Sequence, residues 1–354
     1  MQKKIIVLAI AAALTAPAMA FADATVYGLA AMSIDMAKDG AATNSTSANQ
    51  LVSNNSRIGF KSSEDLGGGL STILQMEGTV GMDVGTTGTS LFNRNTFLGL
   101  KSNDMGTVLV GLHDTPYKIS TRKLDVFGDT VAADNRSAMG VKIMGSNHDS
   151  RLGNVIAYIS PAMSGFTVAA ASVFGAETLP QPAAPADKKG SAMSLAGMYD
   201  NGPIYAALAY QTIKFGDAGT GDLGSATSVD DKATAFKLGG SYKMDAFTVG
   251  AVYESMTYTD NPASTETKGT NLYLAGKFNV SSSDAVKLAY GMRGATKTAG
   301  NDNKDKATLL AVGYDHAMSK ATTVYALYSK LSVDNIAGTA ADPSALSFGM
   351  KYAF

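Results

Sequence analysis

The feature that most constrains this chain is a two-residue alternation of apolar and polar side chains, repeated in segments of about ten residues. The last segment, 345–354, shows it most clearly. One of its faces carries only small residues and a lysine, and the other carries Leu346, Phe348, Met350, Tyr352 and Phe354. This period indicates a β-strand with two unlike faces. Beyond residue 22 no run of 18 apolar residues occurs, so the chain is either a soluble β protein or a closed barrel of strands that crosses a membrane.

The alternation predicts 16 strands, and the connections between them alternate between short and long. Outer-membrane barrels have short turns on the periplasmic rim and longer loops on the outer rim, whereas a soluble sandwich has no cause for such an asymmetry. One face of these strands carries small or charged residues, which cannot pack a dry core. We therefore expect a 16-stranded antiparallel transmembrane β-barrel with a water-filled lumen. The predicted strands are 24–37, 51–62, 70–80, 93–102, 107–114, 149–160, 165–174, 191–200, 203–214, 233–243, 246–258, 268–279, 284–295, 306–317, 321–332 and 345–354, and the first short turn is predicted at Ser63 to Gly69.

The first 22 residues have the organisation of a secretory signal peptide. Lys3 and Lys4 precede an apolar stretch from Ile5 to Leu14, and small residues follow up to Ala22. We expect cleavage after Ala22, with Ala20 as the alternative, so that residues 23–354 form the barrel. The protein is then expected to work beyond the inner membrane.

The composition excludes several classes of function. The chain has no Cys and only three His among 354 residues, which excludes a disulfide framework and a Cys nucleophile and makes a zinc site improbable. We expect no metal and no cofactor. Its 29 basic and 30 acidic residues nearly balance, so nucleic acid is not expected as a partner. His113 and His148 each precede an aspartate but lack a nucleophile motif, so we do not expect an enzyme.

The connection from Thr115 to His148 is longer than a structureless loop usually is, and it is rich in apolar residues. Such a segment needs a surface to pack on, and the inside of the barrel provides one. We expect this connection to fold inward and narrow the lumen, the alternative being a solvated outer loop. Its charged residues include Arg122, Asp125, Asp129, Asp134 and Arg136.

Alternation also assigns the wall arginines. Arg57 faces inward because Ile58 and Phe60 take the other side. Arg94 is expected inward as well, opposite Asn95 and Phe97, because an arginine facing lipid at mid-membrane costs about 2–4 kcal/mol. Tyr273 is the one clear aromatic residue expected on the inward face.

Several motifs in this order resemble the Gram-negative general porins of the beta- and gammaproteobacterial type, across the whole mature length. They are Ala24-Thr25-Val26-Tyr27-Gly28, Asn55-Ser56-Arg57-Ile58-Gly59-Phe60-Lys61, Glu64-Asp65-Leu66-Gly67-Gly68-Gly69-Leu70, Phe92-Asn93-Arg94-Asn95-Thr96-Phe97-Leu98-Gly99-Leu100, Val126-Phe127-Gly128-Asp129 and Gly349-Met350-Lys351-Tyr352-Ala353-Phe354.

The resemblance implies a homotrimer in the outer membrane, in contact with its lipid and lipopolysaccharide. It further implies a third loop folded into each channel and passive diffusion of ions and small hydrophilic solutes. Carried over by position, Arg57, Arg94 and Arg151 would be wall arginines of the pore constriction, with Arg122 and Arg136 as further candidates. Asp129 would be the principal loop acid, followed by Asp125 and Asp134.

Porins of the enterobacterial type carry a basic residue in the first strand, but residues 25–36 of this chain contain none. This difference leaves the ion selectivity of the channel open. An excess of wall basics over loop acids would favour anions. The alternative function is a channel that prefers one class of substrate, either anions such as phosphate or sugars.

Overall fold

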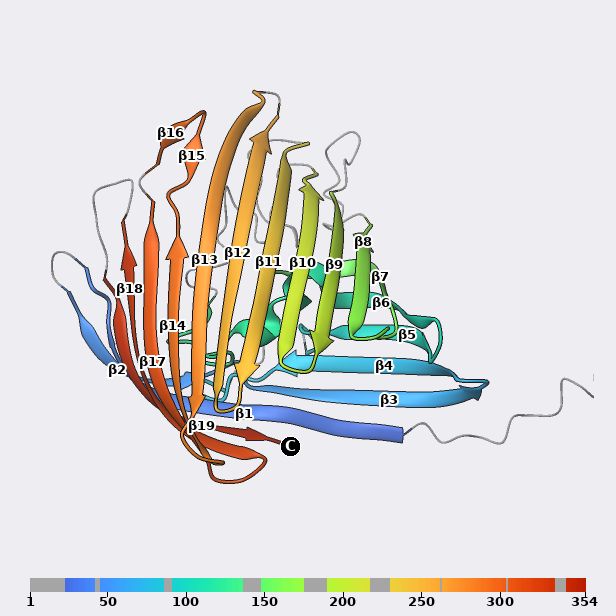
Figure 1. Cartoon of the computed structure of the whole chain (residues 1–354), viewed down its shortest axis with the longest axis horizontal. Coiled ribbons are helices and arrows are strands. Elements are labelled where there is room, and N and C mark those ends of the chain that lie inside the picture. The colour runs from blue at the N-terminus through green and yellow to red at the C-terminus, as the bar shows by residue number, and fades with distance from the viewer. Residues whose placement is uncertain are drawn as a thin grey trace, which may run out of the picture.

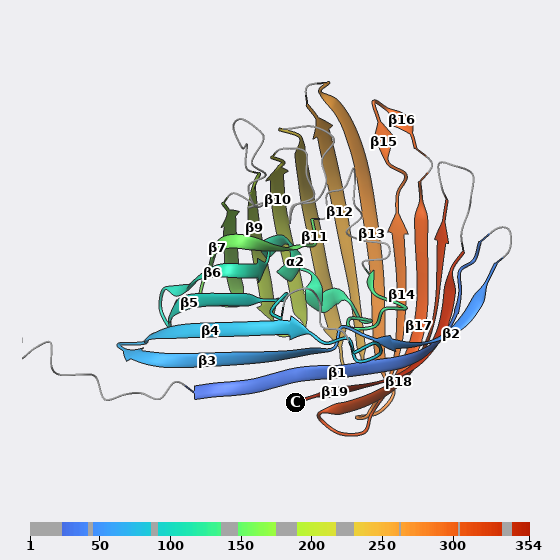
Figure 2. The same cartoon turned by 180° about the vertical axis from the view of Figure 1, so that it is seen from behind.

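The protein forms one closed antiparallel sheet. The computed structural model describes residues 23–41, 45–85, 91–135, 148–174, 190–216, 230–261, 263–303, 305–334 and 342–354. The sheet closes because β1 (Asp23–Lys38) pairs with β19 (Ser344–Ala353) on one side and with β2 (Ser47–Ser53) and β3 (Arg57–Gly67) on the other. In Figures 1 and 2, β1 and β3–β7 form one wall and the long strands β9–β14 form the opposite one.

The predicted 16 crossings are confirmed. The sheet contains 19 strands, but β2 and β3 are successive parts of one crossing. β15 and β16 form a short hairpin in the connection between β14 and β17, where β15 also pairs with the beginning of β13. The other strands are β4 (Leu70–Thr79), β5 (Thr96–Ser102), β6 (Gly106–Asp114), β7 (Arg151–Ile159), β8 (Phe166–Val173), β9 (Ser191–Asn201), β10 (Ile204–Lys214), β11 (Lys232–Met244), β12 (Phe247–Asp260), β13 (Thr265–Asn279), β14 (Asp284–Arg293), β15 (Lys297–Thr298), β16 (Asn301–Asp302), β17 (Ala307–Ala317) and β18 (Thr322–Val333), and the helices are α2 (Pro116–Ile119) and the 3-10 turn η1 (Arg122–Leu124).

Two details of the second crossing differ from the prediction. The strand predicted at 51–62 is interrupted between β2 and β3, where Asn55 has a φ of 55°, in the left-handed region that asparagine tolerates better than most residues. The turn predicted at Ser63 to Gly69 is shorter, because β3 continues through a bulge to Gly67. The chain then reverses at Gly68 and Gly69, both of which have positive φ.

The two faces of the barrel differ as the alternation predicted. Outward positions carry large exposed apolar side chains such as Val26, Leu98 and Leu288. Many inward positions are small or polar and are buried, as at Ala311 and Glu254. No helix among the described residues has the length and apolar character needed to cross a membrane.

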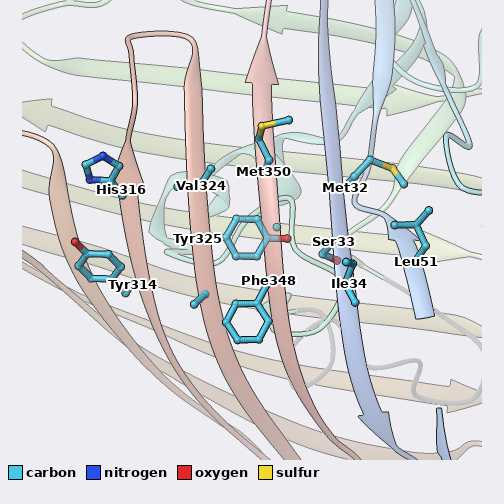
Figure 3. A pocket seen from close by; sticks show the side chains of 12 residues that line it. Met32, Ser33, Ile34, Leu51, Tyr314, His316, Val324, Tyr325, Phe348 and Met350 are labelled. Atoms are coloured by element: carbon cyan, nitrogen blue, oxygen red, sulfur yellow. The ribbon is translucent and has the colours of Figure 1, made fainter. Parts of the chain in front are cut away.

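A shallow apolar groove of about 540 Å³ marks the outer face across β17, β18, β19, β1 and β2 (Figure 3). The strand registers place five outward residues in one row across these strands: Tyr314, Ala326, Phe348, Ile34 and Leu51. In this row the small side chain of Ala326 lies between the aromatic residues Tyr314 and Phe348.

Candidate functional site

The connection after β6 packs on the inward-facing side chains of the barrel. Its first turn, α2, begins at Pro116, and the Thr115 hydroxyl caps it by accepting from the Lys118 amide at 3.3 Å. Tyr117 and Phe127 are completely buried. Figure 2 shows α2 and the residues that follow it between the two walls of the barrel.

The tip of this connection is Phe127-Gly128-Asp129, and three strands hold it. Arg57 on β3 donates to Asp129 at 2.9 Å, and Lys351 on β19 donates to the Gly128 carbonyl at 2.7 Å. The Phe127 ring lies against Gly313 on β17, where a Cβ would lie 2.7 Å from the ring. Asp129 has a φ of 58°, a conformation that aspartate adopts more readily than bulkier residues. Arg57, predicted on the inward face of the wall, and Asp129, expected as the principal acid of the connection, are therefore in direct contact.

The carboxyl group of Asp129 is held in its charged form. Burial raises its pKa, but the hydrogen bond and the charge of Arg57, with Lys351 and Arg122 nearby, outweigh that effect and lower the pKa below the usual 3.8. Asp129 thus carries a negative charge beside the lumen at neutral pH.

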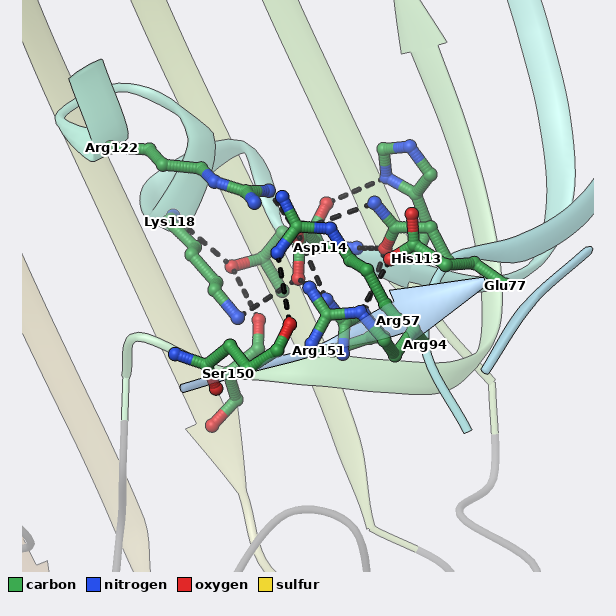
Figure 4. A network of polar contacts seen from close by, with 12 residues as sticks. Arg57, Glu77, Arg94, His113, Asp114, Lys118, Arg122, Ser150 and Arg151 are labelled. Carbon is green, nitrogen blue, oxygen red and sulfur yellow. Dashed lines mark hydrogen bonds and ion pairs between the residues drawn. The ribbon is translucent and has the colours of Figure 1, made fainter. Parts of the chain in front are cut away.

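A second cluster surrounds Asp114 at the end of β6 (Figure 4). Its fully buried carboxylate forms ion pairs with Lys118 at 2.9 Å, Arg151 at 3.1 Å and Arg122 at 3.2 Å. Arg122, with half of its side chain exposed, lies on η1, whereas Arg151 begins β7. Three cations on one anion leave an excess of positive charge, because one carboxylate neutralises one cation.

Arg94 pairs with Glu77 on β4 and not with an acid of the connection (Figure 4). The alternation behind its assignment was wrong in one respect: Phe97 packs inside against His113, and Asn95 donates to Asp114 inside the barrel. The reason is that β5 begins only at Thr96, so residues 91–95 do not follow strand alternation.

Asp125 faces the opposite wall, and no arginine among the described residues forms an ion pair with it. It accepts from the Tyr273 hydroxyl on β13 at 2.9 Å and from the Phe127 amide at 2.9 Å. Burial and the neighbouring charge of Asp134 raise the pKa of Asp125. Arg136, the remaining candidate, lies outside the described residues.

The base of the connection is held by a buried network. Lys237 on β11 is ion-paired with Asp149 and lies 3.6 Å from Glu254 on β12. Tyr117 donates to Glu254 at 2.6 Å, and its ring lies under the Lys237 ammonium, 4.1 Å from the ring centroid. Asn271 donates to the other oxygen of Glu254 at 2.7 Å. These groups tie α2 to three strands of the wall.

The prediction of a single inward aromatic residue was wrong. Tyr273 faces inward as expected, but so do Tyr27, Tyr205, Tyr258 and Tyr325. Two of these tyrosines donate hydrogen bonds from their hydroxyl groups to partners inside the barrel. Tyr205 donates to the Ser120 carbonyl in the connection, and Tyr27 donates to Glu77 at 3.0 Å.

The sequence reasoning missed Glu77, Asp114, Lys118 and Lys351. Alternation along β4 could have found Glu77, since Leu74 faces outward. Lys351 likewise alternates with the apolar face of the last strand. Alternation could not have assigned Asp114 to the inward face, because a register shift between Gly111 and His113 interrupts the alternation just before it.

The connection, the arginines and the acids enclose a space of about 590 Å³. Arg94, Arg122 and Arg151 line it together with the acids Asp125, Asp129, Asp134 and Asp149. Fixed charges of both signs therefore border this space, and such charges create a local electric field. Among the described residues, no group of three His, Asp or Glu could hold a metal ion.

Comparisons with known proteins agree with this architecture. Residues 7–336 match the family described as Gram-negative porin. Outer membrane porin protein 32 of Delftia acidovorans is 28% identical over 334 residues, which cover 92% of this chain and 88% of that protein. The solved structure of an anion-selective porin from Comamonas acidovorans is similar with a TM-score of 0.78 at 21% identity, covering 94% of this chain and 100% of that one. The trimer form of OmpT from Vibrio cholerae is similar with a TM-score of 0.68 at 16% identity, covering 94% and 99%.

Proposed function

This chain belongs to the Gram-negative porin family and forms a diffusion channel in the outer membrane, and we propose that the connection 115–148 folds into this channel as its constriction. The observation that carries the proposal is the contact between Arg57 on the wall and Asp129 on the connection. The two residues are 72 positions apart in the chain, and their contact requires the tip to reach across to β3.

We propose that Arg57, Arg94, Arg122, Arg151, Asp125, Asp129 and Asp134 set the passage of solutes there, with Arg136 as a further candidate. The described part of the site favours anions. The residues that line the gap include five basic ones, Arg94, Lys118, Arg122, Lys123 and Arg151, against four acidic ones, Asp125, Asp129, Asp134 and Asp149, so the basic groups are in slight excess. The similarity to a porin named as anion-selective supports the same preference.

A channel dedicated to sugars is less well supported than a general diffusion channel. Such a channel would present a series of exposed aromatic rings along the lumen. Here the inward rings of Tyr117, Tyr258 and Tyr273 are fully buried. General diffusion of small hydrophilic solutes with an anion preference is therefore the proposed activity.

We propose that the assembly is a homotrimer, after removal of residues 1–22 during export, with lipid and lipopolysaccharide covering the rest of the outer belt. The apolar row across β17–β19, β1 and β2 is a surface that a second copy could cover (Figure 3). The likeness to a structure described as a trimer form supports this assembly.

The test of the constriction is the reversal potential of single channels in planar bilayers under a KCl gradient. Asp129→Asn removes a negative charge from the gap, so the potential should move toward the chloride equilibrium potential. Asp342→Asn is the matched control, because Asp342 pairs with Lys330 at 3.0 Å but on the outer face. An unchanged potential in Asp129→Asn, or an equal shift in the control, would exclude Asp129 from the constriction.

A further inference from the structure

We propose that four inward lysines near the short turns form a positively charged vestibule, which gathers small multivalent anions at the periplasmic mouth of the channel. They are Lys61, Lys101, Lys243 and Lys277. The proposal rests on the channel function but not on the constriction residues, because these lysines lie on different parts of the wall.

Lys243 and Lys277 occupy one wall of this vestibule. Lys243 lies an even number of residues after Lys237 on β11, so the two side chains share one face of the strand. The buried Lys237 faces inward, and Lys243 therefore does so too. Lys277 follows the inward Tyr273 on β13 in the same way. The registers place both lysines opposite Thr248 of β12, so they lie in one inward row across three strands.

Lys61 and Lys101 occupy the opposite wall. Lys61 lies four residues after Arg57 on β3, toward the turn at Gly68, and therefore shares its inward face. Lys101 alternates with the outward Leu98 and Leu100 on β5 and precedes the next short turn. All four lysines are exposed. The short turns are the periplasmic ones in an outer-membrane barrel.

The four ammonium groups are not neutralised by ion pairs. Within the part of the chain that the structure describes, no carboxylate lies within ion-pair distance of any of them, whereas the inward Lys123 pairs with Asp200 and Lys287 pairs with Asp315. Asp65 on the same rim accepts from the Gly67 amide at 2.8 Å. The turns add Asp104, Asp245 and Lys320 beyond the strand ends.

The opposite rim has the opposite composition. The long connections other than 115–148 contain 12 acidic and six basic residues. A wall of low dielectric constant focuses the field of the lysines into the lumen, and such focusing raises local counter-ion concentration by about tenfold or more. The channel should therefore respond differently to a multivalent anion on its two sides.

The experiment measures block of single channels by citrate, added to one chamber and then the other, in 0.1 M KCl. Because the chain has no cysteine, Ser282→Cys in the turn 280–283 can be biotinylated, and streptavidin then identifies the chamber facing the short turns. From that chamber, half-block should need roughly tenfold less citrate than from the other. In 1 M KCl the difference should vanish, since the Debye length falls from about 10 Å to about 3 Å.

The deciding variant is K61Q/K101Q/K243Q/K277Q. Citrate should block the channel of this variant equally from both sides. The matched control K232Q/K268Q changes exposed lysines of the same strands, β11 and β13, at the other rim and on the outer face, and it should keep the wild-type difference. Equal block from both sides in the wild type, or a side difference that survives in the quadruple variant, would overturn the vestibule. A failure of Asp129→Asn to shift the reversal potential would refute the constriction and not the vestibule.

Discussion

The two anchors of the connection 115–135 differ in their access to water. At the tip, the side chains of Arg57 and Asp129 are 18% and 29% exposed, whereas at the base those of Lys237 and Glu254 are 2% and 0% exposed. Breaking a buried ion pair leaves an uncompensated charge and costs about 3–5 kcal/mol. A partly hydrated pair contributes about 1 kcal/mol or less. The base therefore fixes the position of the connection, and the tip can act on ions that pass.

The largest effect is expected at the base. Lys237→Met leaves Asp149 and Glu254 buried near each other without their cation, so the free energy of unfolding should fall by about 3–5 kcal/mol. Thermal unfolding in detergent, followed by heat-modifiable gel mobility, measures this. Lys268→Met is the control, because it breaks an exposed pair with Glu266 and should cost at most about 1 kcal/mol. Equal losses in the two variants would contradict the comparison.

A smaller effect is expected where the tip packs on the wall. Gly313→Ala places a Cβ 2.7 Å from the Phe127 ring, so the ring must move, at a cost of about 1–3 kcal/mol. The displaced tip should also increase the noise of the open-channel current. In Gly276→Ala the nearest atom to the new Cβ is 3.9 Å away, and the channel should remain quiet. A quiet Gly313→Ala channel would show that Phe127 does not position the tip.

At the tip itself we expect a change in selectivity with little change in stability. Arg57→Gln should move the reversal potential toward that of potassium, opposite to Asp129→Asn, because it removes a positive charge. The unfolding free energy should change by about 1 kcal/mol or less. The double variant should return close to the wild-type potential. Shifts of the same sign in the two single variants would refute a field set by this pair.

The smallest effect concerns pH. The pKa of Asp129 is lowered in the folded state, so the stability from its pair with Arg57 is present above the unfolded pKa and is lost only as the pH falls through the lower folded pKa. At pH 3.8 more than half of Asp129 should be ionised and more than half of Asp125 protonated, because the pKa of Asp129 is lowered below 3.8 and that of Asp125 is raised above it. The difference in reversal potential between wild type and Asp129→Asn should therefore persist at pH 3.8. Its disappearance at pH 5 would contradict the lowered pKa.

The sequence predicted the barrel better than the site because the two depend on different signals. Strand alternation has a period of two over whole segments, and a single irregular residue does not obscure it. The site depends on places where alternation fails: the break at Asn55, the irregular residues before Thr96 and the register shift before His113. Arg57 was placed on the inward face because it lies within a regular strand, and Asp129 was named from the resemblance of its motif, but that these two residues pair is known only from the structure.

The base network could not be predicted from the same pattern. Lys237 and Glu254 are inward by alternation, but nothing local indicates that Tyr117, more than 100 residues earlier, lies between them. Contacts between a connection and a distant strand depend on how the connection folds, which the alternation of strands does not encode. Only the three-dimensional arrangement assigns their partners.

The pairing of β1 with β19 has a consequence for biogenesis. Until residues 344–353 are available, one edge of β1 keeps its amide and carbonyl groups free, and such an edge readily recruits a strand of another chain. β19 is thus the strand that shields this edge of β1. Barrel formation should therefore require a sealing step by β19, and truncation within β19 should yield aggregates instead of a smaller barrel.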